Sequence, residues 1–161
     1  MAWVDCRAAK LMTEIGIVLG AITTGNGYST SMVTVKYDDF ALTQRVTDYP
    51  IAEVIPADID TEDIDTETQQ ITFSFKILAY ILLTASAEAL ANRKTHLEFA
   101  ADIRTALLSI YARQQAGTFT MAGFLKMENI NQTLFTSEIP KGLAGVFSQV
   151  DFKFDAKFTD R

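Results

Sequence analysis

Hydrophobic positions repeat at helical spacing in two segments of this chain. In residues 3–23 five apolar side chains form one stripe, which predicts an amphipathic helix ending at Gly25-Asn26-Gly27. The stripe consists of Leu11, Ile15, Val18, Leu19 and Ile22. Residues 84–115 are rich in Ala, Leu, Glu and Arg and predict a second, long helix, which Gly117 ends. The apolar positions of this helix are Ala89, Leu90, Leu97, Ala101, Leu107, Leu108 and Tyr111.

Alternation of apolar and polar residues predicts strands elsewhere in the chain. Short strands are expected at residues 32–37 and 51–55, and strand-like residues extend over 118–128. The clearest alternation covers residues 70–82, where one face is apolar and the other begins polar and ends apolar. We therefore expect the second half of this strand to be covered on both faces. Residues 146–158 predict a long half-buried strand whose wet face alternates in charge.

The order helix, strands, long helix, strands predicts an α+β fold. We expect a mostly antiparallel sheet, with the N-terminal helix and the long second helix packed on one face. A single domain over residues 1–161 is expected, because no linker interrupts the chain. Pro56 is expected to close the strand before it, and residues 136–145 are expected to form a loop.

The pentapeptide Asp-Ile-Asp-Thr-Glu occurs twice in succession, at residues 58–67. It holds six of the 20 acidic residues, and the other 14 are balanced by 14 Lys and Arg, so the net charge of −6 belongs to this segment. The six are Asp58, Asp60, Glu62, Asp63, Asp65 and Glu67. The neutral remainder lacks the basic footprint of sequence-independent DNA binding.

Three interpretations of the repeat stay open. The first is a solvated loop that charge repulsion keeps extended. The second is a loop that lines a cavity or docks on a basic partner surface. The third is a calcium site, although an EF-hand loop needs glycine at its sixth position and glutamate at its twelfth. Counted from Asp58, these positions are Asp63 and Gln69, so this register does not fit.

Candidate catalytic residues are few. Cys6 and His96 are each alone of their type, so no internal disulfide forms and a zinc site lacks its usual Cys and His ligands. Packing is the favoured role for Cys6. Asp102 lies among apolar residues and is expected at the edge of the core, bonded to a basic group or to backbone. The sequence therefore predicts no enzyme, no cofactor and no metal site.

Composition indicates a folded, non-membrane protein. Of the 161 residues, 48% are apolar and 21% are charged, which suffices for a real core. Residues 1–10 mix acid and base without an apolar run, unlike a signal peptide. The most apolar stretch, residues 71–83, contains Lys76 and is too short for a bilayer. We expect a soluble protein, intracellular or inside an assembled particle.

Several segments follow one another in a familiar order. They are the helix end GAITTGNGY, the strand YPIAEVIPAD, the strand QQITFSFKILAY, the helix segment ANRKTHLEFAADIRTAL and the closing GVFSQVDFKFDAKF. This order resembles the tail terminator or neck proteins of tailed bacteriophages. The resemblance covers residues 8–158 and is best in ITFSFKI, around Asp102-Ile103 and in QVDFKFDAKF. The duplicated pentapeptide is not part of it.

The resemblance implies a structural virion protein of the viral tail. It would be one subunit of a ring, usually a hexamer, that caps the tail tube, stops its polymerisation and joins the tail to the head. Its partners would be copies of itself, the tail tube protein, a neck, head-completion or connector protein and, in a contractile tail, the sheath. DNA would only pass non-specifically through the bore. The protein would lie in the virion and, during assembly, in the host cytoplasm.

In such a ring the acidic repeat is expected to line the bore, where it would repel DNA, or to dock on a neighbour. Long strands with exposed edges suit a sheet that continues across subunits, and the charges of the last strand are expected to fix the register there. The candidate contacts are Lys141, Asp151, Lys153, Asp155 and Lys157. The alternatives are a tail tube subunit, a head-completion protein and a small acidic metal-dependent binder.

Overall fold

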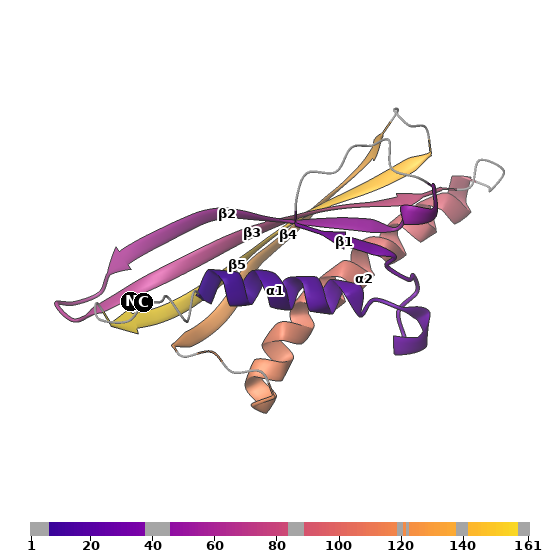
Figure 1. Cartoon of the computed structure of the whole chain (residues 1–161). Coiled ribbons are helices and arrows are strands. Elements are labelled where there is room, and N and C mark those ends of the chain that lie inside the picture. The colour runs from indigo at the N-terminus through magenta and orange to yellow at the C-terminus, as the bar shows by residue number, and fades with distance from the viewer. Residues whose placement is uncertain are drawn as a thin grey trace.

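The computed structural model describes residues 7–37, 46–83, 89–118, 121, 123–137 and 142–157. Over these residues the predicted α+β fold is confirmed, with two α-helices on one side of a five-stranded sheet (Figure 1). The helices are α1 (Arg7–Gly20) and α2 (Ala89–Ala116), and two 3-10 turns are η1 (Thr24–Asn26) and η2 (Val46–Asp48). The strands are β1 (Thr34–Lys36), β2 (Ile51–Asp63), β3 (Thr68–Leu82), β4 (Phe124–Ser137) and β5 (Leu143–Lys157).

The strands lie in the order β1-β2-β3-β5-β4. All neighbours pair antiparallel except β1, which is parallel to β2 and reaches only Ile51, Ala52 and Glu53. Beyond these three residues β2 pairs only with β3, and β4 pairs only with β5, within the described part of the chain. The sheet thus ends in two unpaired edges, the outer half of β2 and the whole of β4.

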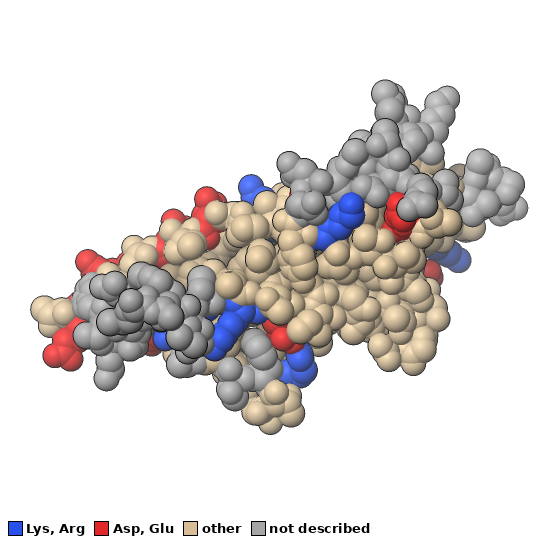
Figure 2. Space-filling view, viewed as in Figure 1, with Lys and Arg blue, Asp and Glu red and all other residues tan. Residues whose placement is uncertain are grey.

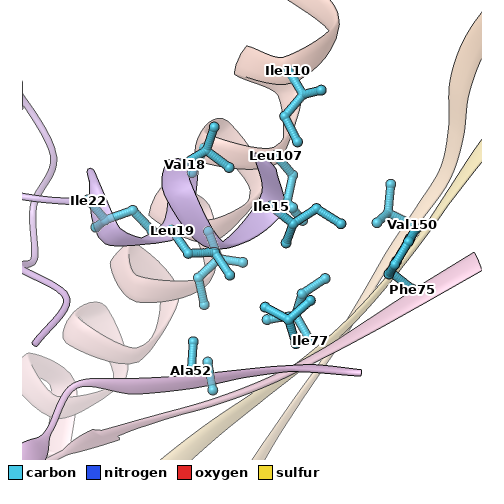
Figure 3. Packing of buried hydrophobic residues seen from close by; sticks show 14 of the residues in the cluster. Ile15, Val18, Leu19, Ile22, Ala52, Phe75, Ile77, Leu107, Ile110 and Val150 are labelled. Atoms are coloured by element: carbon cyan, nitrogen blue, oxygen red, sulfur yellow. The ribbon is translucent and has the colours of Figure 1, made fainter. Parts of the chain in front are cut away.

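The predicted stripe of α1 forms the centre of the core (Figure 3). Ile15 and Leu19 are fully buried in one cluster with Leu107 of α2 and Ile77 of β3. Helical spacing places the side chains of the stripe on one face of α1, where they pack against both α2 and the sheet. Burying each side chain of this size contributes about 1.5–3 kcal/mol, so this cluster holds the two helices on the sheet.

The second half of β3 is covered on both faces, as predicted. On the face away from the helices, Tyr80 packs with Tyr49, Ile51 and Leu143. The ring of Phe135 on β4 meets the Tyr80 ring edge to face, with centroids 5.6 Å apart. This smaller cluster lies at the opposite end of β2 and β3 from the acidic repeat.

Two predicted boundaries are wrong. β2 does not close at Pro56 but continues to Asp63, and its pairing with β3 shifts register between Pro56 and Ile59. Proline is tolerated at such an irregularity on a strand that has a neighbour on one side only. Most of the described part of the predicted loop at 136–145 belongs to β4 and β5, which pair there.

Candidate assembly surfaces

The duplicated pentapeptide forms the outer end of β2 and the turn into β3. All six of its acidic residues are exposed, as a solvated segment predicts, but residues 58–63 are strand and not loop. Asp60 and Thr61 pair with Thr72 and Ile71 of β3, and this pairing satisfies backbone groups that a loop would leave to water. Figure 2 shows acidic side chains gathered at this end of the molecule.

The turn of the hairpin is held by one carboxylate. The Asp65 side chain accepts hydrogen bonds from the backbone N–H of Glu67 at 2.8 Å and of Thr68 at 2.7 Å. These two bonds hold the pKa of Asp65 below its usual value. The backbone N–H groups of Ile64 and Asp65 both donate to the Thr68 carbonyl oxygen, at 3.0 and 3.2 Å. The repeat therefore forms the end of a β-hairpin whose turn is fixed by hydrogen bonds.

The carboxylates of the hairpin do not gather around one point. Within the described residues no group of three or more His, Cys, Asp or Glu side chains could hold a metal ion. Strand geometry explains this for the repeat, because successive side chains alternate between faces. Asp60 and Glu62 lie on one face of β2, and Asp63 lies on the other.

Charged side chains on the face away from the helices form ion pairs within β4 and between β4 and β5. The Glu128 carboxylate of β4 accepts hydrogen bonds from the ammonium groups of Lys126 on the same strand and of Lys153 on β5, each at 2.9 Å. The bonds from Lys126 and Lys153 lower the pKa of Glu128, and the bond to Glu128 raises the pKa of Lys153. Lys126 is exposed and Glu128 and Lys153 are half-buried, so each pair contributes little to stability, and its main effect is to orient the side chains.

Asp151 is also engaged within the chain. It accepts a hydrogen bond from the Ser74 hydroxyl at 2.7 Å and one from the Asn129 side-chain amide at 3.0 Å. Asn129 lies at an irregularity of β4 and has a positive φ of 55°, a conformation that asparagine tolerates better than most residues.

The last strand, whose charges are expected to fix the register between subunits, lies inside the sheet and not at its edge. β5 lies between β3 and β4, because residues 124–137 fold back along it. Asp155 is exposed opposite Gln70, and Lys157 pairs through its backbone with Thr68. The side chain of Lys157, like the whole of Lys141, lies outside the described residues. Contacts between these charges and a neighbouring subunit stay a prediction.

Asp102 has the structural role expected for it. It is 7% exposed on α2 and accepts hydrogen bonds from the backbone N–H groups of Ser29 and Thr30, at 3.2 and 2.8 Å. The Thr30 hydroxyl donates a third bond at 2.6 Å. The carboxylate thereby ties the segment after η1 to α2.

His96 also joins two elements. Its Nε2 lies 2.7 Å from the carbonyl oxygen of Gly145 on β5. A carbonyl only accepts, so Nε2 carries the hydrogen and α2 is bonded to the sheet. Cys6, for which packing was the favoured role, lies outside the described residues.

The outer face of α2 was not identified from the sequence. Leu90, Leu97 and Leu108 are 63%, 60% and 42% exposed, and among the predicted apolar positions of this helix Leu107 is buried. The buried face is instead Phe99, Ala100, Ile103, Ala106, Leu107 and Ile110. The spacing of three leucines could have revealed the outer face. Leu97 follows Leu90 by seven residues and Leu108 follows Leu97 by eleven, so all three lie on a second face of the helix. A helix that is apolar on two faces is typically covered on both.

This outer face lies beside the unpaired edge of β4. The Arg104 guanidinium on α2 donates to the Ile130 carbonyl oxygen of β4 at 3.3 Å, and the Tyr111 and Phe124 rings are 6.5 Å apart. Toward the other end an open groove of about 310 Å³ separates helix and strand. It is lined by Arg93, His96, Leu97, Leu134, Phe135 and Thr136. Exposed apolar side chains and unpaired backbone therefore meet at this side of the molecule.

Comparison with models of known protein families and with curated proteins finds no match for this chain. Neither helix that the structure describes is long and apolar enough to cross a membrane.

Proposed function

We propose that this protein is a structural subunit of a ring that caps a phage tail tube, stops tube growth and joins the tail to the neck. The observation that carries the proposal is the unfinished sheet, which is unpaired along β4 and along outer β2. The apolar outer face of α2 lies beside the first of these edges. A subunit with such surfaces is completed by copies of itself.

The two unpaired edges differ in sequence, and a contact that joins one to the other is head to tail. A head-to-tail contact closes into a ring when the rotation between copies divides a full turn, and otherwise gives an open filament. A ring with a bore suits the charge distribution. The repeat holds the whole net charge of −6, and carboxylates at the bore repel DNA in transit.

Analytical ultracentrifugation tests the proposal. We expect the purified protein to sediment as one closed oligomer, or as a monomer that becomes oligomeric only on isolated tails. A protein that stays monomeric and does not associate with tails would contradict the proposal.

A tail tube subunit is the second candidate, because head-to-tail edges also support open growth. Negative-stain microscopy separates the two. A tube subunit forms filaments alone, whereas a terminator added in small amounts to growing tubes stops them at short lengths. Filaments from the purified protein would favour the tube subunit.

A further inference from the structure

The two unpaired edges of the sheet have opposite strand directions. β2 is antiparallel to β3, β3 to β5, and β5 to β4, and three reversals leave β4 antiparallel to β2. A second copy in the same orientation, placed beside β4, therefore presents its β2 as an antiparallel partner. Such pairs exchange backbone hydrogen bonds perpendicular to the strands.

We propose that outer β2 of one copy pairs with residues 124–128 of β4 in the next copy, with Asp60 beside Lys126 and Ile59 beside Met127. This pairing rests on the proposed function and deepens it, because it names the surfaces that join neighbouring subunits.

A polar row across the sheet gives the register. On the face away from the helices, Asp60, Thr72, Lys153 and Lys126 are successive partners on β2, β3, β5 and β4. A copy that continues this row places its Asp60 beside Lys126, whose side chain is 55% exposed. Opposite charges in cross-strand positions are favourable.

An apolar row on the helix side gives the same register. Ile59, Phe73, Phe152 and Met127 are successive partners on the same four strands. Ile59 is 63% exposed at one end of this row, and Met127 is half-buried at the other. The next copy brings its Ile59 to Met127, so a side chain that is exposed in the single chain becomes buried.

The acidic residues explain why β2 takes β4 as a partner and not a second β2. Four of residues 58–63 are Asp or Glu, so two β2 edges in contact would bring like charges together. Residues 124–128 carry one charge of each sign, on Lys126 and Glu128. The edge of β4 therefore carries no net charge, unlike a second β2 edge.

The shape of β4 limits the contact to its first segment. Its register with β5 shifts between Glu128 and Asn131, where Asn129 has a positive φ. Residues 124–128 lie level with the part of β2 that β1 leaves uncovered. Thr133, Leu134 and Phe135 of β4 lie level with Glu53, Ala52 and Ile51, which β1 covers.

Disulfide crosslinking tests the pairing in a Cys6→Ser background that carries Asp60→Cys and Lys126→Cys. Within one chain three strand spacings, about 14 Å, separate the two positions, which is too far for a disulfide. Between copies in the proposed register they are direct neighbours. Mild oxidation should give a ladder of covalent dimers, trimers and larger species, which reduction returns to monomer.

Matched variants control for chance collisions. Asp60→Cys with Thr133→Cys, an exposed position further along β4, should give no ladder. Asp60→Cys alone or Lys126→Cys alone should give no efficient dimer. A dimer from Asp60→Cys alone would show β2 pairing with β2, and one from Lys126→Cys alone would show β4 pairing with β4. Either result would overturn the proposal.

Sedimentation of the wild-type protein distinguishes failure of the proposed strand pairing from failure of the proposed ring. A stable oligomer whose Asp60→Cys/Lys126→Cys variant gives no ladder would overturn this pairing and leave the ring in place. A wild-type protein that stays monomeric in solution and does not associate with isolated tails would overturn both the proposed ring and the proposed pairing.

Discussion

At the scale of single residues, carboxylates connect segments that are distant in sequence. Asp102 holds the segment around Thr30, and Glu14 of α1 forms an ion pair with Arg113 of α2. The sequence predicts the first role, because an acid within an apolar helix segment needs a partner. It does not predict the second, because Glu14 is buried only once folding brings Arg113, 99 residues away, beside it.

Asp102→Ala is expected to lower the free energy of unfolding by about 1–3 kcal/mol, because it leaves donors of Ser29 and Thr30 without an acceptor. Asp102→Asn retains one acceptor oxygen and should cost less. Denaturant unfolding measures both changes. Glu98→Ala, on an exposed part of the same helix, is the control and should stay within about 0.5 kcal/mol of the wild type. Equal losses of unfolding free energy for Asp102→Ala and Glu98→Ala would show that Asp102 does not stabilise the segment around Thr30.

Asp65→Asn is expected to change how stability depends on pH. Hydrogen bonds from the backbone of Glu67 and Thr68 lower the pKa of Asp65 in the folded protein. The stability that this group contributes is therefore present above the ordinary Asp pKa, and it is lost as the pH falls through the lowered folded value. Unfolding curves between about pH 2 and pH 7 should show wild type and variant converging toward acid. A difference that stays constant over this range would exclude the mechanism.

At the scale of elements, periodicity finds apolar positions but does not say which neighbour covers them. In α2 apolar residues lie on two faces, and only the contacts with α1 and the sheet decide that Leu107 is buried and Leu108 is not. In β2 the five-residue period of the repeat hides the two-residue period of a strand. Pairing of Asp60 with Thr72 on β3 decides the conformation there, and no local pattern predicts it.

Leu107 and Leu108 offer a matched pair of substitutions, one on the buried face of α2 and one on its outer face. Leu107→Ala should lower the free energy of unfolding by about 2–5 kcal/mol, because it opens a cavity in the core. Leu108→Ala should leave the stability of the single chain within about 0.5 kcal/mol and weaken the oligomer. Thermal unfolding at low protein concentration and sedimentation at high concentration measure the two effects. An unchanged oligomer would exclude the outer face from assembly.

At the scale of the whole molecule, the helices cover one face of the sheet, and its two edges, outer β2 and β4, have no neighbouring strand within the described residues. The layer order follows from the sequence, because the helices and strands segregate along the chain. The edges do not follow from it, because no pattern in the sequence says that β5 lies between β3 and β4 and leaves β4 at the edge. The irregularities at Phe124/Lys126 and Glu128/Asn131 also interrupt the alternation of β4.

The acidic edge is expected to keep copies from joining in the wrong way. The variant Asp60→Asn/Glu62→Gln lowers the charge of this edge and should aggregate faster than the wild type, into species without a defined size. Glu98→Gln/Asp155→Asn changes the net charge by the same amount away from the edge and should not. Light scattering during incubation compares the variants. Equal aggregation would assign the effect to net charge alone.

Because β2 and β4 run in opposite directions and carry different side chains, an assembly built by joining them has a sense of rotation. Every copy has the same orientation around the ring, so the two faces of the ring are not equivalent. Its upper and lower rims are then chemically distinct surfaces made from one kind of chain. In the proposed ring, one gene product would in this way offer two different surfaces, one to the tail tube and one to the neck.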